Sequence, residues 1–211
     1  MASVQPGVYA IVDLDACRAR GLEPLAVARA LCTAPLAALQ LRAKHASDRE
    51  RLALAEAIGA AARAARIPFV LNDRTDLARI AGADGVHLGQ EDLPARLARP
   101  WLGLDRWIGL STHDAAQVDA AGAEPVDYLG FGPVFATATK TEASPVVGLD
   151  GLRRAVARAA HPIVAIGGIR LEDLPAVRAA GARAAALVSA LLEGDPAEQA
   201  ARAVRLFGGM S

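Results

Sequence analysis

The chain has 211 residues, of which 53% are hydrophobic and 22% are charged, an ordinary balance for a packed globular protein. Lys plus Arg equals Asp plus Glu at 23 each, which excludes a bulk electrostatic field for nucleic acid or anionic membranes, so any anion site must be local. This length suits one large domain or two small ones, and a chain of this size buries a core that needs neither disulfides nor metals.

The N-terminal residues predict a cytoplasmic protein. Residues 1–6 contain neither a basic region nor an apolar stretch, so we expect no signal peptide. No charge-free apolar run approaches the roughly 18 residues needed to span a bilayer. Cys17 and Cys32 lack metal-ligand and redox spacing, which predicts two unreactive thiols in a reducing compartment.

Two residue types are scarce in this arginine-rich chain. Its only lysines are Lys44 and Lys140, and its only asparagine is Asn72. The planar fork of Arg does not replace the compact ammonium of Lys at every site. The lysines are therefore either chance survivors or positions where an ammonium is required.

Short apolar runs alternate with amphipathic segments about eight times along the chain. The runs are too short and too continuous for exposed strands, and they predict parallel strands that are buried on both faces. They cover residues 8–12, 38–41, 68–71, 85–88, 107–110, 128–131, 163–166 and 185–188.

Helical patterns lie between these runs, for example over residues 48–65, 114–121 and 171–180, and Gly82, Gly122 and Gly181 follow helical segments as expected stops. Eight strand-helix units predict an α/β fold, a (β/α)₈ TIM barrel, as a single domain over residues 1–211. Its active site should lie at the carboxyl ends of the strands. The segment 132–148 is too long for an ordinary connection in a compact barrel, which predicts a functional loop.

Two cations and an amide follow the second run. Strand alternation places Gln40, Arg42 and Lys44 on one face, pointing into the barrel mouth. Such a group suits a diphosphate. The alternative is a pair of solvated cations at a strand end.

Acids follow the third and fourth runs. Asn72 and Asp73 come after one run and Asp92 after the next, and each acid alone is typical of a helix cap. As a pair on neighbouring strands, Asp73 and Asp92 instead predict a Mg²⁺ site, because Mg²⁺ takes one or two carboxylates together with waters and phosphate oxygens.

The fifth and sixth runs offer hydrogen-bonding groups but no nucleophile. Ser111 follows the fifth run as a hydrogen-bond donor, and the sequence has no nucleophile-elbow motif. His87 and His113 are expected to be structural, and His45 and His161 to lie on the surface. The long loop carries Thr137, Thr139 and Lys140, which could close over a phosphorylated ligand.

Glycine-rich and small residues follow the last two runs. Gly167-Gly168 and Val188-Ser189 occupy the loops that commonly build the phosphate cup of this fold, where backbone N–H groups bind the anion. The alternative is that the glycines form only a tight turn.

The combination of these motifs resembles the thiamine-phosphate synthase family, in order from residue 8 to about residue 190. The motifs are Gln40-x-Arg42-x-Lys44, Asn72-Asp73, His87-x-Gly89-Gln90-x-Asp92, Ser111-x-His113, Gly132-Pro133-Val134-Phe135-x-Thr137-x-Thr139-Lys140, Ile166-Gly167-Gly168-Ile169 and Val188-Ser189. Single pieces occur in many phosphate-binding barrels, whereas the combination is specific. The first strand ends in Val12-Asp13, where the family pattern has a Thr-Asp pair.

The resemblance implies a Mg²⁺-dependent transferase. The family joins hydroxymethylpyrimidine diphosphate to a carboxylated thiazole phosphate and releases pyrophosphate and CO₂. Its displacement is thought to be dissociative, with pyrophosphate leaving before the thiazole nitrogen attacks. Such a step needs charge stabilisation and exclusion of water but no protein nucleophile.

The resemblance also implies roles for individual residues. The pyrimidine diphosphate would contact Gln40, Arg42, Lys44, Asn72, Ser111 and Lys140, of which Arg42, Ser111 and Lys140 would be catalytic. The thiazole phosphate would contact Thr137, Thr139, Gly168, Val188 and Ser189. Asp73 and Asp92 would hold Mg²⁺.

Partners other than phosphorylated small molecules are limited to a possible homo-oligomer, with neither nucleic acid nor membrane expected.

The nearest rival function is a thiazole tautomerase, which shares the barrel but needs no diphosphate and Mg²⁺ site. Another phosphate-sugar isomerase would need a paired acid and base at the strand ends. A non-catalytic metabolite-binding regulator would not need intact metal acids.

Overall fold

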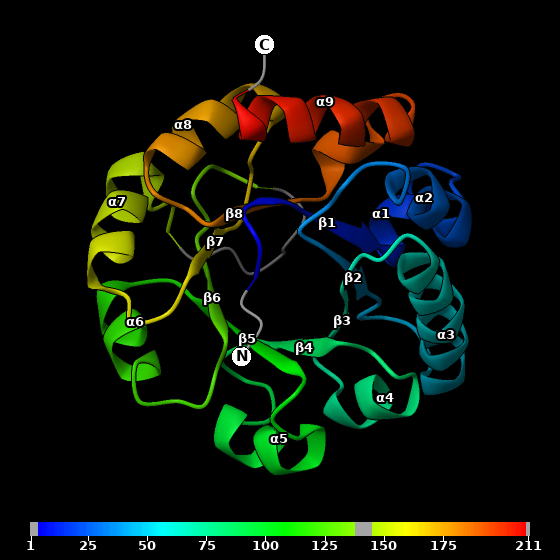
Figure 1. Cartoon of the computed structure of the whole chain (residues 1–211), viewed down its shortest axis with the longest axis horizontal. Coiled ribbons are helices and arrows are strands. Elements are labelled where there is room, and N and C mark those ends of the chain that lie inside the picture. The colour runs from blue at the N-terminus through cyan, green and yellow to red at the C-terminus, as the bar shows by residue number, and fades with distance from the viewer. Residues whose placement is uncertain (1–3, 138–144, 210–211) are drawn as a thin grey trace.

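The computed structural model describes residues 4–137 and 145–209 and forms a closed barrel of parallel strands inside a ring of helices (Figure 1). Each strand pairs with the next along the chain, and the last pairs with the first. The strands are β1 (Gly7–Asp13), β2 (Ala38–Arg42), β3 (Phe69–Asn72), β4 (Gly85–Leu88), β5 (Trp107–Thr112), β6 (Tyr128–Phe131), β7 (Ile163–Ala165) and β8 (Ala184–Leu187). The prediction of a (β/α)₈ TIM barrel is confirmed.

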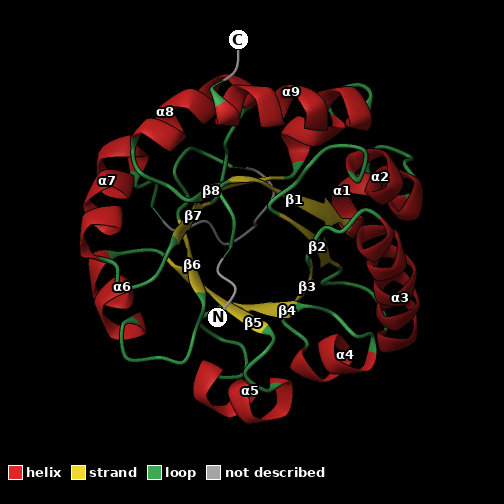
Figure 2. Cartoon of the chain, in the orientation of Figure 1, coloured by secondary structure: helices red, strands yellow, loops and turns green. Residues whose placement is uncertain are grey.

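Helices form the outer layer and cover the sheet on its outside (Figure 2). They are α1 (Leu14–Arg18), α2 (Pro24–Leu31), α3 (Asp48–Ala64), α4 (Thr75–Ile80), α5 (Ala95–Leu102), α6 (Ala115–Ala121), α7 (Gly148–Arg158), α8 (Leu174–Ala179) and α9 (Pro196–Gly208), with 3₁₀ turns η1 (Leu171–Asp173) and η2 (Ser189–Leu192). Within the described ranges, no helix has the length and apolar character to cross a membrane.

Strand positions agree with the sequence to within two residues at every end. The largest difference is in β5, which continues through Ser111 and Thr112 because these residues still pair with Gly130 and Phe131 of β6. The apolar run ends at Leu110, so hydrophobicity alone could not reveal this extension.

Helix ends follow local capping chemistry. The predicted helix over residues 171–180 divides into η1 and α8, because Pro175 has no N–H to continue the helical hydrogen bonds from the preceding turn. Gly82 and Gly181 adopt the left-handed conformation expected of a helix stop, with φ of +64° and +93°. Gly122 instead ends α6 with φ of −60°, so any residue would fit its backbone.

Two hydrophobic clusters form on the two faces of the sheet. The larger lies between strands and helices and includes Leu39, Leu71 and Leu129. The smaller fills the barrel interior and includes Val4 and Trp107, both less than 10% exposed. Its polar members, Tyr9 and Tyr128, also line the site described below.

Candidate active site

A cavity of about 930 Å³ opens at the carboxyl ends of the strands. This volume is typical of a small-molecule site. Every predicted site residue within the described ranges lines it: Gln40, Arg42, Lys44, Asn72, Asp73, Asp92, Ser111, Thr137, Gly168, Val188 and Ser189. The predicted residues Thr139 and Lys140 lie outside the described residues.

Arg42 and Lys44 form the cationic side of the cavity. Arg42 ends β2, and its Nη1 donates to Asp13 Oδ2 at 2.5 Å. The Asp13 side chain is 2% exposed, and its Oδ1 accepts from the Ala16 N–H at 2.8 Å, so one buried carboxylate both caps α1 and orients Arg42. Lys44 follows two residues later and is exposed. The sequence identified Asp13 only as part of a strand end and missed its positioning role.

Asp73 and Asp92 approach each other where β3 and β4 end. Burial, followed by a hydrogen bond with Asp92 and the charge of Asp92, raises the pKa of Asp73 to about 6. Lys44 and a hydrogen bond from Asn72 act in the opposite direction. Two carboxylates this close resist carrying two negative charges unless a cation joins them.

The alternative that these acids cap helices is wrong. Helices α4 and α5 begin at Thr75 and Ala95, and neither start receives a side-chain cap. Asp92 Oδ2 accepts instead from the Gly89 N–H at 2.6 Å, within its own loop. Asp73 has a φ of +65°, in the left-handed region that Asp tolerates better than most residues. Neither acid is therefore occupied by a helix end.

The donor chemistry of the acid pair fits Mg²⁺. Hard carboxylate oxygens are the ligands that this ion prefers, and a bound cation would offset the repulsion between the two acids that raises the pKa of Asp73. Within the described residues, no group of three or more His, Cys, Asp or Glu side chains is placed to hold a metal ion. Waters and substrate phosphate oxygens would have to complete the coordination.

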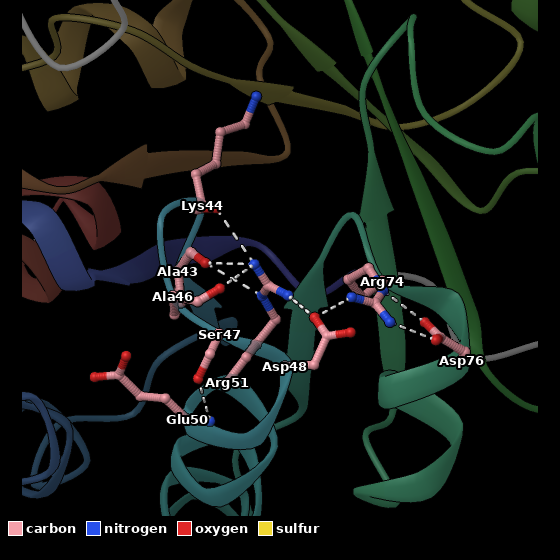
Figure 3. A network of polar contacts seen from close by, with 9 residues as sticks. All are labelled: Ala43, Lys44, Ala46, Ser47, Asp48, Glu50, Arg51, Arg74 and Asp76. Atoms are coloured by element: carbon pink, nitrogen blue, oxygen red, sulfur yellow. Dashed lines mark hydrogen bonds and ion pairs between the residues drawn. The ribbon is translucent and has the colours of Figure 1, made fainter.

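Arg51 of α3 holds the loop that carries Lys44 (Figure 3). Its side chain is only 11% exposed. Its Nε and Nη2 donate to carbonyl oxygens of the loop at 2.9–3.3 Å, and its Nη1 donates to Asp48 at 2.7 Å; the carbonyl groups belong to Ala43, Lys44 and Ala46. The Lys44 side chain extends away from Arg51, so the guanidinium binds the backbone and leaves the ammonium to the cavity.

Asp48 connects this loop to the turn that carries Asp73. The carboxylate of Asp48 accepts from Arg74 as well as from Arg51. Arg74 follows Asp73 directly, and it also makes a bidentate pair with Asp76 at 2.6 and 2.9 Å. The network therefore links the cationic loop after β2 to the acidic turn after β3.

Two tyrosines that the sequence interpretation passed over lie in the cavity floor. Tyr9 and Tyr128 are the only tyrosines of the chain, and both lie inside predicted strand runs. They are 1% and 0% exposed, and each hydroxyl is hydrogen-bonded. A phenol in a strand buried on both faces needs an internal partner, and this signal could have revealed a polar barrel interior.

The opposite side of the cavity is built from backbone. Gly167 and Gly168 follow β7 with φ of +87° and +66°. A Cβ at Gly168 would lie 2.6 Å from the carbonyl oxygen of Phe135 and closer still to that of Ala136. Glycine is required here because the loop after β6 crosses directly over it. Val188 and Ser189, after β8, line the same cavity as this turn.

The histidines have structural surroundings. His113 Nδ1 contacts the Gly132 carbonyl oxygen at 2.6 Å and anchors the start of the long loop. His87 is buried, with both ring nitrogens within hydrogen-bond distance of neighbouring hydroxyl groups. His45 is exposed and pairs with Asp15, as expected of a surface residue. His161 is half-buried, so the prediction of a surface position is wrong for it.

Residues 8–191 match the family model of thiamine monophosphate synthase. A thiamine-phosphate synthase of Herpetosiphon aurantiacus is 42% identical over 203 residues, which cover 96% of each chain. That of Chloroflexus aurantiacus is 41% identical over 92% of this chain and 89% of the relative. The thiamine-phosphate synthase of Synechococcus sp. (strain CC9605) is 46% identical over 164 residues, and there the match spans only 46% of the longer relative.

Solved structures agree with this relationship. A thiamine phosphate pyrophosphorylase from Pyrococcus furiosus superposes with a TM-score of 0.87 at 28% identity, with 98% of both chains covered. A tryptophan synthase α-subunit from the same organism reaches 0.72 at 15% identity, a likeness of fold alone. On the family match and these relatives, the chain belongs to the thiamine monophosphate synthase family.

Proposed function

We propose that the chain forms thiamine phosphate from hydroxymethylpyrimidine diphosphate and a carboxylated thiazole phosphate, with release of pyrophosphate and CO₂. One observation supports this best: a single cavity contains an acid pair and two cations at β2–β4 and a glycine-rich cup at β7–β8. These strand groups lie on different sides of the barrel (Figure 1). Two phosphorylated substrates bound there would have their rings meet in the cavity between them.

The pyrimidine diphosphate binds along β2 to β5 in this proposal. Arg42 and Lys44 neutralise the diphosphate, and Asp13 keeps the Arg42 guanidinium in place for it. Gln40, Asn72 and Ser111 contact the ring, and Lys140 approaches from the long loop. A Mg²⁺ ion held by Asp73 and Asp92 would stabilise negative charge on the departing pyrophosphate.

The thiazole phosphate binds at the cup, through Gly168, Val188 and Ser189 with Thr137 and Thr139 from the loop. The proposed displacement requires no protein nucleophile. What the residues supply is charge stabilisation at the leaving group and a cavity that excludes water while the new carbon–nitrogen bond forms.

A direct assay tests this function. The purified chain is mixed with both substrates, with and without Mg²⁺, and thiamine phosphate is detected by mass spectrometry. We expect product only with both substrates and Mg²⁺. Conversion of the thiazole alone would indicate a tautomerase, and product that forms equally well in EDTA would contradict the metal assignment.

We also propose a cytoplasmic protein that can form a homo-oligomer. Exposed apolar side chains gather at and beside α4 and α5, and a second copy could cover them. They are Ile80, Leu93, Leu97, Trp101 and Leu104. Sedimentation equilibrium measures the state of association.

A further inference from the structure

A series of hydrogen bonds, here called the relay, connects Asn72 to Ser111 among the residues that line the cavity. Its members in order are Asn72, Gln40, Tyr9, Tyr128, His87 and Ser111. Gln40 Nε2 donates to Asn72 Oδ1 at 2.7 Å, and the Tyr9 hydroxyl donates to Gln40 Oε1 at 2.9 Å. The Tyr9 and Tyr128 hydroxyl oxygens lie 2.8 Å apart. The relay thus joins β3, β2, β1 and β6 across the interior of the barrel.

The relay continues through His87 to Ser111. His87 Nδ1 lies 3.1 Å from the Tyr128 hydroxyl, and His87 Nε2 lies 2.9 Å from Ser111 Oγ. The imidazole and the Tyr128 ring stack with centroids 5.6 Å apart. Asn72, at the far end, donates a hydrogen bond to the Asp73 carboxylate.

The contact between Asn72 and Asp73, at one end of the relay, sets the direction of every hydrogen bond in it. An amide nitrogen only donates, so the Asn72 nitrogen faces a carboxyl oxygen of Asp73 and the Asn72 oxygen faces Gln40. Gln40 must then donate to Asn72, and its own oxygen receives the Tyr9 proton. Because a hydroxyl has one proton, Tyr9 can only accept from Tyr128.

The same logic fixes the tautomer of His87. The Tyr128 proton is directed to Tyr9, so the Tyr128 oxygen accepts from His87 Nδ1–H. In a neutral imidazole that carries its proton on Nδ1, the other nitrogen, Nε2, accepts. Ser111 therefore donates its proton to His87 Nε2, and its oxygen keeps only lone pairs for the cavity.

We infer that Tyr9, Tyr128 and His87 are positioning residues that hold the Ser111 oxygen as a hydrogen-bond acceptor in the cavity. Such a site selects a ligand with an N–H donor, such as an aminopyrimidine, over the same ring with an oxo group. This inference deepens the proposed function and rests on it for the identity of the ring.

The packing of the barrel supports a fixed arrangement of these rings. A Cβ at Gly109 of β5 would lie 2.5 Å from His87 Nδ1 and would also strike the Tyr128 ring. A Cβ at Gly130 of β6 would lie 3.0 Å from His87 Cε1. Glycine on both flanking strands leaves the space that the stacked His87–Tyr128 pair occupies. Burial also raises the pKa of both tyrosines far above the ordinary value, so each hydroxyl keeps its proton.

The first test measures the tautomer without any substrate. Long-range nitrogen-15 NMR of histidine-labelled protein at pH 8 distinguishes Nδ1–H from Nε2–H, and the His87 signals are assigned by their loss in His87→Gln. We expect Nδ1–H in the natural protein and a shift toward Nε2–H in Tyr128→Phe. An Nε2–H tautomer in the natural protein would reverse the direction of the relay and overturn the inference.

The second test measures ring selection. The aminopyrimidine diphosphate and its oxo counterpart are compared by kcat/KM. A site built around a hydrogen bond rejects the wrong partner strongly, so we expect a preference of at least about a hundredfold, reduced at least about tenfold in Tyr128→Phe. The KM for the thiazole phosphate should stay within about twofold. Equal losses with both pyrimidines would mean that Tyr128 only supports the fold.

Two further variants keep the result interpretable. Thr112→Val removes a buried hydroxyl from the residue next to Ser111. That hydroxyl donates to the Gly130 carbonyl oxygen at 3.1 Å and is not part of the relay. This variant should therefore change neither the His87 tautomer nor the preference for the aminopyrimidine. Tyr9→Phe breaks the relay one bond earlier and replaces Tyr128→Phe if that protein does not fold. If the natural protein makes no thiamine phosphate, the proposed function is wrong. The NMR measurement of the His87 tautomer still tests the direction of the hydrogen bonds in the relay, because it needs no substrate.

Discussion

Asp73 is a residue whose charge opposes the fold. Its pKa rises from 3.8 to about 6 through burial and the neighbouring Asp92. Because the folded-state pKa is the higher one, ionising Asp73 destabilises the fold progressively between about pH 4 and pH 6, and the full cost is present above pH 6. A bound cation would offset this cost.

Asp73→Asn should therefore separate stability from activity. In EDTA at pH 7.5 the variant should be more stable by about 1 kcal/mol after allowance for partial exposure, a rise in Tm of about 2–4 °C. Asn also tolerates the φ of +65°. At pH 4 the difference should vanish. Turnover with Mg²⁺ should fall at least about a hundredfold, as for other transition-state charge stabilisers. Near-normal turnover at saturating Mg²⁺ would contradict the metal assignment.

Lys140 tests whether an ammonium or only a positive charge is required. Lys140 lies outside the described residues, so this prediction depends on the scarcity of lysine in the sequence. Lys140→Arg should lose activity despite its charge, because the longer, planar guanidinium would displace a phosphate oxygen or a threonine contact. Small misplacements at a reacting centre can cost about a hundredfold in rate. If steady-state kinetics show that Arg restores most of what Lys140→Ala loses, only the charge matters.

At the level of elements, the turn after β7 depends on the loop after β6. Any side chain at Gly168 would strike the carbonyl groups of Phe135 and Ala136, just before Thr137. Gly168→Ala should therefore raise the KM for the thiazole phosphate at least about tenfold and leave the KM for the pyrimidine diphosphate nearly unchanged. Gly21→Ala is a matched control, because Gly21 has the same φ of +66° but no neighbour within 4 Å. Equal loss of both affinities would contradict the two-substrate arrangement.

The loop after β2 depends on Arg51 in the same way. Arg51→Met removes the guanidinium that binds three carbonyl oxygens, and we expect a KM for the pyrimidine diphosphate raised about tenfold. Arg51→Lys should not rescue it, because an ammonium cannot reproduce the fork that spans the loop and Asp48. Arg153→Met removes an exposed pair with Asp150 and serves as the control. Kinetics that match the control would show that the loop holds its shape without Arg51.

Strand order and strand ends were predictable because each short apolar run has to be buried on both faces, and in a parallel barrel all carboxyl ends meet at one mouth. That geometry brings Gln40, Arg42 and Asp73 into one cavity. The relay was not predictable, because Tyr9 and Tyr128 are 119 residues apart on strands that are not neighbours in the sheet. Arg51 was equally hidden, since nothing in its helix distinguishes it from a solvated arginine.

At the scale of the whole molecule, the packing of α1 against the outside of the barrel controls access to Cys17. This residue is 0% exposed in α1, directly after β1, which pairs with both β2 and β8. Burial, and next the charge of Asp13, raises the pKa of the Cys17 thiol to about 11. At pH 8 only about one thiol in a thousand would be ionised even if a reagent reached it. Cys32 is half-buried and its pKa is also raised by burial.

Cys17 should therefore report separation of α1 from the barrel. With a disulfide reagent at pH 8, Cys32 should react before Cys17. Cys17 should react at least about a hundredfold faster in denaturant than in the native protein, because its reaction requires α1 to separate from the sheet. Mg²⁺ and the pyrimidine diphosphate should slow Cys17 further, since ligands that bind only the folded state lower the open population. The Cys32→Ala and Cys17→Ala variants assign the two rates. Native Cys17 that reacts as fast as Cys32 would mean that α1 detaches readily in the native protein, and that the Asp13 cap does not hold it.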